Sequence, residues 1–349
     1  MTLNNKKDSQ TANKNLTIKD IARMSKMSIG TVSRVINNSG PVSEPTRNKV
    51  NEIIRQTNYL PNNAAKSMVN KKSGIIGIIV PDISNPFLCS HVDLLHKFFS
   101  DAGFSVMLCN SGYNNDNVVN FTNNLIQRNA EGVVFISSYI NDEKQISLIK
   151  SKLKVVLISS SFGGFDSVSV ADWQSAFDVV EYLVSAGHKH IACIGYNDTS
   201  PPTMERYRGY CDAMKKNGFK LNKNYQVPAD NVISDLHQMG YTMAKKLLDL
   251  PVPPTAIFVI NDYYAINAYF AVKEKGLIVG KDISIAGYHD IDICQLVKPS
   301  LTTVKCQVDT LTSLAADILL KKIQEEDSGE VKSILLTGEL VIRESVAVL

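Results

Sequence analysis

The sequence predicts a small all-α region near its N-terminus, followed by a larger α/β region built on parallel sheets. Two short segments with the apolar spacing of helices lie within the first 60 residues. From residue 74 onward, short apolar runs alternate with helical stretches, which is the pattern of parallel strands joined by helices. Charge divides the chain at the same place. Residues 1–72 carry 13 basic and four acidic side chains, a net charge of +9, whereas residues 73–349 carry 24 basic and 30 acidic side chains, a net charge of −6.

The first expected element is a pair of short helices joined by a tight turn. Apolar residues recur at three- and four-residue steps on both sides of the turn, and they are Ile18, Ile21, Ala22, Val32, Val35 and Ile36. Ser28 stands where its hydroxyl can cap the second helix. Two helices joined by so short a turn are typical of a helix-turn-helix motif. A third helix is expected from Ser43, with Pro45 in its first turn.

The outward face of the second helix carries small and hydrogen-bonding side chains. With the apolar positions turned inward, the outer positions are Ile29, Gly30, Thr31, Ser33, Arg34 and Asn37. In a major groove, Arg34 can reach guanine edges or phosphate, and Asn37 can reach base edges or the backbone. The alternative is a small helical bundle whose polar face has no partner. The concentrated positive charge of residues 1–72 favours a nucleic-acid partner for this region alone.

Residues 74–349 contain seven apolar runs that we expect to be buried strands. These runs are Ile75–Val80, Val106–Cys109, Gly132–Ile136, Val155–Ile158, His190–Ile194, Ala256–Ile260 and Ile283–Ala286. Helical stretches between many of them are Ser90–Asp101, Val118–Arg128, Ser175–Ala186, Glu205–Asn217 and Gln238–Leu250. The region is long enough for two parallel sheets covered on both faces. Ligands of such sheets bind beyond the carboxyl ends of the strands.

Several motifs along the chain resemble those of the LacI/GalR family of repressors. They are Thr17-Ile18-Lys19-Asp20-Ile21-Ala22, Ser28-x-x-Thr31-Val32-Ser33-Arg34-Val35-x-Asn37, Val42-Ser43, Tyr59-x-Pro61-Asn62, Ile79 through Phe87, and Leu340 through Ser345. The resemblance covers about residues 16–346. It implies a helix-turn-helix headpiece joined to a two-lobed α/β body of the periplasmic-binding-protein type, with two doubly wound parallel sheets.

The resemblance also implies a division into four segments. A disordered arm is expected at 1–15, the DNA-binding headpiece at 16–60, a hinge helix with its linker at 61–73, and the effector-binding and dimerisation domain at 74–349. Within the last segment, lobe 1 is expected at about 74–171 and 305–335, and lobe 2 at about 172–304 and 336–349. The chain is expected to cross between the lobes near Val170–Trp173, Thr303–Lys305 and Leu335–Thr337.

The family's DNA contacts carry over to named positions of this chain. The headpiece positions are Thr17, Ser28, Ile29, Gly30, Thr31, Ser33, Arg34, Asn37 and Tyr59. In the hinge segment they are Asn62, Ala65, Lys66 and Met68, of which Met68 stands where an apolar wedge enters the minor groove in the family. Read from its residues alone, the hinge segment is better interpreted as a plain linker, because so short a helix is marginal in water.

The effector site is expected in the cleft between the lobes. The candidate contacts are Asp82, Ser84, Phe87, Trp173, Arg206, Asn261, His289 and Asp290. Arg206 lies three residues before Gly209, as the family's effector-binding arginine does, and Arg208 is the competing candidate. Asn261 and Asp262 follow a strand directly, so that a helix cap is the alternative role for this pair. Trp173, Phe87 and Tyr263 are candidate stacking residues, and aromatic residues in such positions also serve as core.

Three positions depart from the acidic residues that sugar-binding members use. His289 follows the aromatic residue where an aspartate is usual, Ser159 follows the fourth strand, and Ala171 follows Val170. Because a histidine cannot accept two hydroxyl protons as a carboxylate does, we expect a ligand other than a plain neutral sugar. With Arg206 and a protonated His289 facing the cleft, the hypothesis is an anionic ligand such as a sugar phosphate. The alternative is that His289 is simply a packed side chain.

The sequence contains no catalytic constellation, so we expect a non-enzyme without cofactor or metal. Gly163-Gly164 lacks the phosphate-loop lysine, His188-Lys189-His190 has no acidic or cysteine partner nearby, and no Gly-x-Ser-x-Gly elbow is present. The N-terminus lacks a signal peptide, and no apolar run is long enough to span a membrane. The expected protein is a cytoplasmic, nucleoid-associated homodimer that binds a pseudo-palindromic operator under the control of a sugar, a sugar phosphate or another anionic metabolite. The alternative is a regulator of the same fold controlled by a protein co-regulator.

Overall fold

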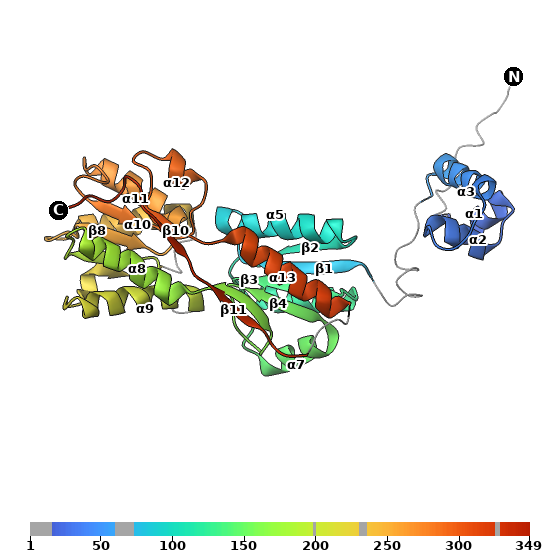
Figure 1. Ribbon diagram of the computed structural model, residues 1–349, viewed down its shortest axis with the longest axis horizontal. Coiled ribbons are helices and arrows are strands. Elements are labelled where there is room, and N and C mark those ends of the chain that lie inside the picture. Colours follow the sequence, from blue (N-terminus) through green and yellow to red (C-terminus); the bar gives the residue numbers. More distant parts are fainter. Residues whose placement is uncertain (1–15, 60–72, 198–199, 230–235, 325–328) are drawn as a thin grey trace, which may run out of the picture. The chain divides into compact units, whose positions relative to one another are not determined.

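The computed structural model describes residues 16–59, 73–197, 200–229, 236–324 and 329–349 of the chain. These form two compact units, one within residues 1–73 and one within residues 74–349 (Figure 1). We call the first the headpiece and the second the body. The expected N-terminal arm, and the hinge positions Asn62, Ala65, Lys66 and Met68, lie outside the described residues.

The headpiece is a three-helix unit, with α1 at Ile18–Ser25, α2 at Ile29–Ile36 and α3 at Glu44–Thr57. Its small core is formed by apolar side chains from all three helices and from the segment after α3: Ile21, Ala22, Val32, Val35, Val50 and Tyr59. These include apolar positions whose three- and four-residue spacing predicted the helices. The all-helical headpiece is thereby confirmed.

The body contains two parallel sheets, as the alternation of strands and helices predicted. The first has the order β11-β5-β4-β3-β1-β2, with β1 at Ile75–Val80, β2 at Ser105–Asn110, β3 at Gly132–Ile136, β4 at Lys154–Ile158, β5 at Asp166–Val170 and β11 at Ser333–Leu336. The second has the order β7-β6-β8-β9, with β6 at Ile191–Ile194, β7 at Gln226–Val227, β8 at Ala256–Val259 and β9 at Ser284–Ala286. All seven predicted strands are present. Strands β5 and β11 lie beyond that prediction, because alternating serines and exposed positions break up their apolar character.

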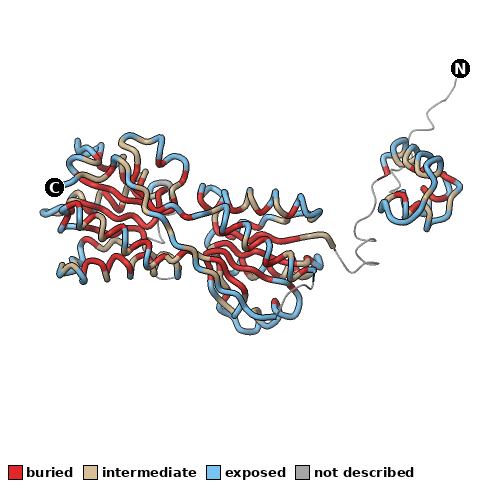
Figure 2. The backbone as a smooth tube through the Cα atoms, viewed as in Figure 1, coloured by how far each residue is buried: buried red, intermediate tan, exposed pale blue. Residues whose placement is uncertain are grey.

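Helices cover both faces of the first sheet (Figure 1). Helices α5 (Pro86–Asp101) and α13 (Val308–Ile323) pack on one face, and α6 (Asn115–Gln127) and α7 (Glu143–Lys152) pack on the other. Successive residues of one strand therefore enter different cores: Ile78 and Val80 face the first pair of helices, and Ile79 faces the second pair. Burial on both faces explains why β1 reads as an uninterrupted apolar run (Figure 2).

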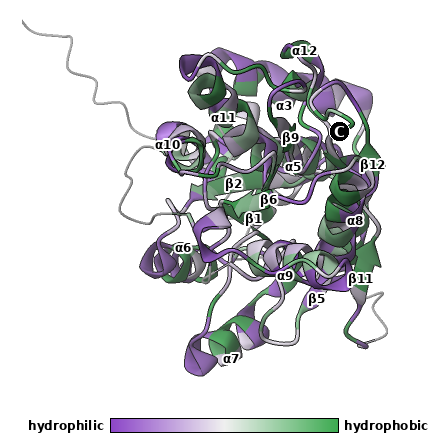
Figure 3. Ribbon diagram, turned by 90° about the vertical axis from the view of Figure 1, so that its left-hand side faces the viewer, coloured by the Kyte–Doolittle hydropathy of each residue, from purple (hydrophilic) through white to green (hydrophobic). Residues whose placement is uncertain are grey.

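The second sheet is flanked by two pairs of closely packed helices. Helix α8 (Asp172–Ser185) packs on α9 (Pro201–Lys216), and α10 (Leu236–Leu248) packs on α11 (Asp262–Glu274). A Cβ at Gly209 would lie 2.4 Å from the Trp173 carbonyl oxygen, so a glycine at this position lets α9 approach α8. Hydrophobic residues concentrate in the strands of both sheets, as the green colour around β1 and β6 shows (Figure 3).

The chain passes between the two sheets at three places, and these crossings bring distant segments together. It leaves β5 for α8 at Ala171, returns through β10 (Thr303–Lys305) to α13, and leaves β11 for β12 (Glu339–Val341). Strands β10 and β12 pair antiparallel at the crossing. The remaining short elements are the 3-10 turn η1 (Lys223–Tyr225) and helix α12 (Ile293–Leu296). Among the described residues, no helix has the length and apolar character needed to span a membrane.

Candidate functional site

The α1–α2 turn of the headpiece is built by local hydrogen bonds. Lys26 ends α1 in the left-handed conformation, with φ of 57°. Ser28 then caps α2: its hydroxyl oxygen accepts a hydrogen bond from the Thr31 amide at 3.0 Å and lies 2.9 Å from the Thr31 hydroxyl. The capping role predicted for Ser28 is therefore present in the structure. The cap fixes where α2 begins, and hence which of its side chains point outward.

The outward face of α2 holds the residues that the periodicity placed there. Ile29 has 47% of its surface exposed. Gly30, Arg34 and Asn37 are also exposed, while Val32 and Val35 are buried on the opposite face. The Asn37 amide donates to the Ser33 hydroxyl at 3.2 Å, which links the two polar positions one turn apart. The result is a short solvent-facing surface of one cation, one amide, hydroxyls and one aliphatic group.

Two other predicted headpiece contacts take structural roles. The Thr17 amide and hydroxyl both donate to the Asp20 carboxylate, at 3.0 and 2.7 Å, at the start of α1. The Thr17 hydroxyl in particular lowers the pKa of Asp20. The Tyr59 ring belongs to the headpiece core, with 7% of its surface exposed. Their proposed DNA contacts remain predictions.

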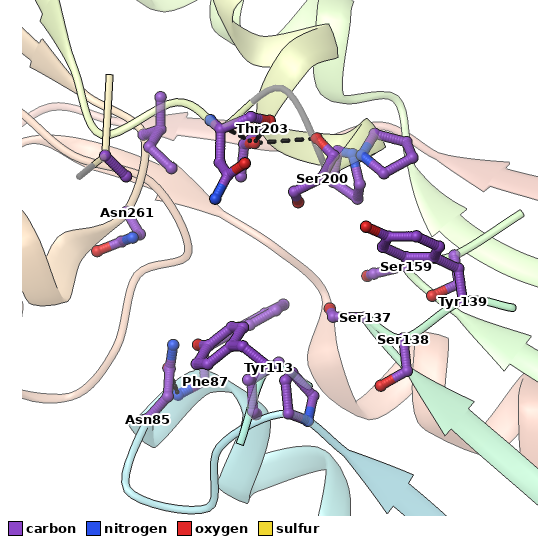
Figure 4. A pocket seen from close by; sticks show the side chains of 18 of the residues that line it. Asn85, Phe87, Tyr113, Ser137, Ser138, Tyr139, Ser159, Ser200, Thr203 and Asn261 are labelled. Carbon is purple, nitrogen blue, oxygen red and sulfur yellow. Dashed lines mark hydrogen bonds between the residues drawn. The ribbon is translucent and has the colours of Figure 1, made fainter. Parts of the chain in front are cut away.

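A cavity of about 550 Å³ lies in the body between the two sheets. We call the first sheet with its helices lobe 1 and the second sheet with its helices lobe 2. Lobe 1 supplies residues that follow β1, β2, β3 and β4, and lobe 2 supplies residues that follow β6 and β8 together with parts of α9 and α11. The carboxyl ends of strands from both sheets therefore face this cavity, which is the usual position of a binding site in proteins built on parallel sheets. Ser137, Ser138 and Tyr139 lie across the cavity from Ser200 and Thr203 (Figure 4).

Four of the eight predicted effector contacts line this cavity: Phe87, Arg206, Asn261 and His289. Asn261 also caps α11, because its side-chain oxygen accepts a hydrogen bond from the Tyr264 amide at 2.8 Å. The two roles that the sequence left open for Asn261 are thus compatible. The competing candidate Arg208 is exposed and pairs with Glu205 at 2.5 Å.

The other four predicted contacts do not line the cavity. The Asp82 carboxylate accepts hydrogen bonds from the amide and hydroxyl of Ser84, at 2.8 and 2.7 Å, within the loop before α5. The Trp173 indole donates to Asp212 at 3.0 Å and stacks on Phe177, because its position on α8 faces α9. Asp290 forms an ion pair with Arg343 at 2.7 Å. Trp173 and Asp290 thus have protein partners, and the effector contacts predicted for these four residues remain predictions.

His289 is packed, and the surroundings of its imidazole disfavour the protonated state that the sequence analysis expected. Its ring stacks on the ring of Phe87, with centroids 3.7 Å apart and planes at 13°, so a lobe 2 residue contacts a lobe 1 residue here. Burial, with the nearby positive charge of Arg206, lowers the pKa of His289 well below its usual value. The imidazole is therefore neutral near pH 7. His289 also adopts φ of 118°, a conformation that non-glycine residues rarely take.

Arg206 is buried and has an internal counter-ion. Its Nε donates to the Asp172 carboxylate at 2.7 Å, its Nη1 donates to the Ile260 carbonyl at 2.8 Å, and its guanidinium lies 3.9 Å from the Tyr288 ring centroid. Burial raises the pKa of Asp172, and the adjacent guanidinium opposes that rise. Asp172, one residue after Ala171, is therefore the partner of Arg206 and does not line the cavity.

Sequence reasoning also missed the hydroxyl groups of lobe 1. Ser137, Ser138 and Tyr139 follow β3, and Ser159, Ser160 and Ser161 follow β4. Ser137 and Ser159 adopt left-handed conformations, with φ of 44° and 50°, immediately after their strands. The signal was available, because both predicted strands are followed directly by serines, and side chains at the carboxyl ends of parallel strands are the usual ligand contacts.

Comparisons with known proteins match both units of the chain. Residues 17–62 match the family described as bacterial regulatory proteins, lacI family, and residues 180–346 match the periplasmic binding protein-like domain. Catabolite control protein A of Priestia megaterium is 32% identical over 89% of this chain and 94% of its own length. The HTH-type transcriptional repressor CytR of Escherichia coli K12 is 31% identical over 95% of this chain and 97% of its own length. A crystal structure of the Lac repressor dimer bound to operator and the anti-inducer ONPF is 26% identical, with a TM-score of 0.83, over 96% of this chain and 100% of that chain.

Proposed function

The chain belongs to the lacI family of bacterial regulatory proteins, and we propose that it is a repressor whose affinity for operator DNA is controlled by a small molecule bound in the body. It acts as a homodimer on a pseudo-palindromic site in the cytoplasm. The observation that carries this proposal is the exposed, capped helix α2, whose polar face has no partner within the described headpiece while its apolar face is buried.

DNA recognition divides between side chains that read bases and groups that bind phosphates. Arg34 is long enough to form paired hydrogen bonds with guanine in the major groove, and Ile29 can contact a thymine methyl group. Gly30 leaves room for the helix to approach the base edges. Ser28, Ser33 and Thr17 lie near the start or on the flank of this surface and contact phosphates. The positive charge of residues 1–72 makes the affinity salt-dependent.

Two-fold symmetry relates the operator to the protein. Two headpieces that read half-sites about one helical turn apart require a dimer, with its axis at the centre of the operator. The hinge segment joins each headpiece to its body, and we propose that Met68 wedges into the minor groove there, with Asn62, Ala65 and Lys66 beside it. A ligand that prefers one arrangement of the lobes shifts the population of DNA-binding protein by its difference in affinity for the two states.

The cavity supports a small-molecule effector rather than a protein co-regulator. Its volume of about 550 Å³ falls within the range of roughly 300–1,000 Å³ that is usual for small-molecule sites. Its walls come from both lobes, so that a ligand in contact with both changes the energy of closing them. The Phe87–His289 stack already joins the lobes at the edge of this cavity.

The test of DNA recognition is a comparison of two arginines. Genomic fragments selected by the full-length protein are titrated by fluorescence anisotropy with wild type, with Arg34→Ala, and with the matched control Arg55→Ala in α3. Loss of a base contact costs about 1–3 kcal/mol, so Arg34→Ala weakens the selected fragment roughly ten- to hundred-fold. The control lowers affinity for selected and random duplex alike. An equal affinity of wild type for selected and random duplex, with and without candidate effectors, contradicts the proposal.

A further inference from the structure

The turn that follows α2 is bonded to the backbone of Arg34. Asn38 adopts a left-handed conformation, with φ of 49°, and its amide donates to the Val35 carbonyl at 3.3 Å. The Ser39 amide donates to the Arg34 carbonyl at 3.0 Å. Together these two bonds form a Schellman motif, in which a left-handed residue satisfies the last carbonyls of a helix. The helix that we propose to read bases therefore ends on a bond to its own arginine.

The same turn also lies against the side chain of Arg34. Gly40 adopts φ of 71°, and a Cβ built on it would lie 3.6 Å from Arg34 Cδ and 4.0 Å from Arg34 Nε. The stem of Arg34 therefore passes beside the backbone of Gly40. A glycine suits this place, because residues with a Cβ rarely adopt a positive φ. The turn thus contacts Arg34 at two points, the carbonyl and the end of the aliphatic stem.

Arg47 fastens this turn to α3. It lies near the start of α3 and donates from Nη1 to the side-chain oxygen of Asn38 at 2.6 Å. A hydrogen bond from a guanidinium is charge-assisted and therefore stronger than a bond between neutral groups. Helix α3 packs on α1 and α2, and its Val50 belongs to the headpiece core. The turn is therefore anchored to the packed part of the headpiece.

Such an anchor affects base reading more than phosphate binding. Paired hydrogen bonds from an arginine to guanine require one orientation of the planar guanidinium. A long side chain that moves freely loses conformational entropy when it takes up that orientation, and the loss lowers affinity. A contact with phosphate depends mainly on charge and tolerates more orientations. Holding the stem of Arg34 should therefore favour the correct sequence over other duplexes.

We propose that Arg47 is a positioning residue for base recognition: through Asn38 it fixes the turn that holds Arg34, and it thereby contributes to the choice of operator sequence. This inference rests on the proposed role of α2 as the helix that reads DNA. Arg47 acts through Asn38 and Gly40 and touches no base. Its effect therefore lies in the preference for one sequence, whereas a direct phosphate contact by Arg47 would strengthen binding to every duplex alike.

The first test removes the acceptor of this bond and leaves every charge in place. Full-length wild type and Asn38→Ala are titrated by fluorescence anisotropy with the selected fragment and with random duplex. We expect affinity for the selected fragment to fall roughly five- to ten-fold, which is part of the loss expected for Arg34→Ala, and affinity for random duplex to stay within about two-fold. An unchanged ratio of the two affinities overturns the proposal.

Asn58→Ala is the matched control for the backbone. Asn58 ends α3 in the same left-handed conformation as Asn38, with φ of 49°. The two substitutions therefore place alanine in equally strained positions of one unit. The ratio of selected to random affinity in Asn58→Ala should equal that of wild type. The same fall in both variants would attribute the effect to a general loss of headpiece structure and would overturn the proposal.

A double-mutant cycle tests whether the turn acts through Arg34. Once Arg34 is replaced by alanine, Asn38→Ala should cause no further loss of affinity for the selected fragment. Substitutions that act independently give additive losses. Equal losses from Asn38→Ala in the presence and absence of Arg34 would therefore contradict the proposed positioning.

Arg47→Ala tests the assigned residue, with Arg55→Ala as the control that removes the same charge. We expect the ratio of affinities to fall as in Asn38→Ala, and the dependence of random-duplex affinity on salt to match that of Arg55→Ala. A salt slope smaller than that of the control by about one, with selected and random duplex weakened alike, identifies a phosphate contact and overturns the proposal. If Arg47→Ala does not fold, the Asn38→Ala cycle decides, because it leaves α3 unchanged. Equal affinity of wild type for selected and random duplex would refute the repressor proposal instead, so the two failures are distinguishable.

Discussion

Arg34 and Arg206 show how differently the two units use the same side chain. Arg34 lies exposed on α2 of the headpiece, whereas Arg206 lies 5% exposed in the body with its Nε on Asp172. The first is free to pair with an external anion and contributes little to folding. The second is part of the fold, because its charge has to be paired before it can be buried. When an arginine aligns with a ligand-contacting arginine of a family, the position of its nearest carboxylate therefore decides whether its charge is available to a ligand.

The largest expected effect tests this contrast by truncating each arginine. Arg206→Ala leaves Asp172 buried without its partner, which should cost the body about 3–5 kcal/mol of stability. Arg34→Ala, at an exposed site, should change stability by less than about 0.5 kcal/mol. Urea unfolding followed by the fluorescence of Trp173, the single tryptophan, reports on the body. A loss in Arg206→Ala as small as in Arg34→Ala would show that the pair is not needed for folding.

Acid should lower the stability of the body more than that of the headpiece, because all six histidines lie in the body. Burial lowers the pKa of His91 from 6.5 to about 4. The unfolded chain therefore binds a proton near pH 6.5 that the folded body does not accept until about pH 4. Stability falls as pH decreases through this window, by about 2 kcal/mol between pH 7 and pH 5 from this one group. His188 and His289, whose pKa values are also lowered, act in the same direction.

The measurement is hydrogen exchange on the full chain at pH 7 and pH 5, after correction for the intrinsic exchange rate. Amides of the body sheets should lose protection, and headpiece amides in α1 and α2 should keep theirs. His91→Gln should lose less protection than wild type over the same interval. Equal losses in the headpiece and the body would exclude the histidines as the cause.

The smallest expected effect compares one helix cap in each unit. Ser28→Ala removes the cap of α2 and Asn261→Ala removes the cap of α11, and each should cost about 1 kcal/mol of local stability. Their functional effects should differ. Ser28→Ala should weaken operator binding at unchanged effector affinity, because α2 is the helix that we propose to contact DNA. Asn261→Ala should weaken effector binding, because Asn261 also lines the cavity. Anisotropy and calorimetry on both variants measure the two effects, and a reversed pattern would contradict the assignment of sites.

How much could be predicted differs between the units for a physical reason. In the headpiece, the Ser28 cap and the faces of α2 depend on residues within one or two turns, so periodicity placed Ile29 and Arg34 correctly on the outer surface. In the body, the predicted strands were found, yet half of the effector positions were not at the cavity. The start of α8 decided that Asp172 faces Arg206 and that Trp173 faces α9. Neither partner is near in the sequence.

From the sequence alone follow the helix-turn-helix headpiece, the parallel sheets of the body and the charge difference between them, because these depend on local periodicity and composition. Only the tertiary structure decided the charge of the cavity that we propose as the effector site. That charge depends on a pair 34 residues apart, Asp172 and Arg206, and on the packing that keeps His289 neutral. Burial and long-range pairing set the protonation state of an ionisable group, and neither can be deduced from its neighbours in the sequence.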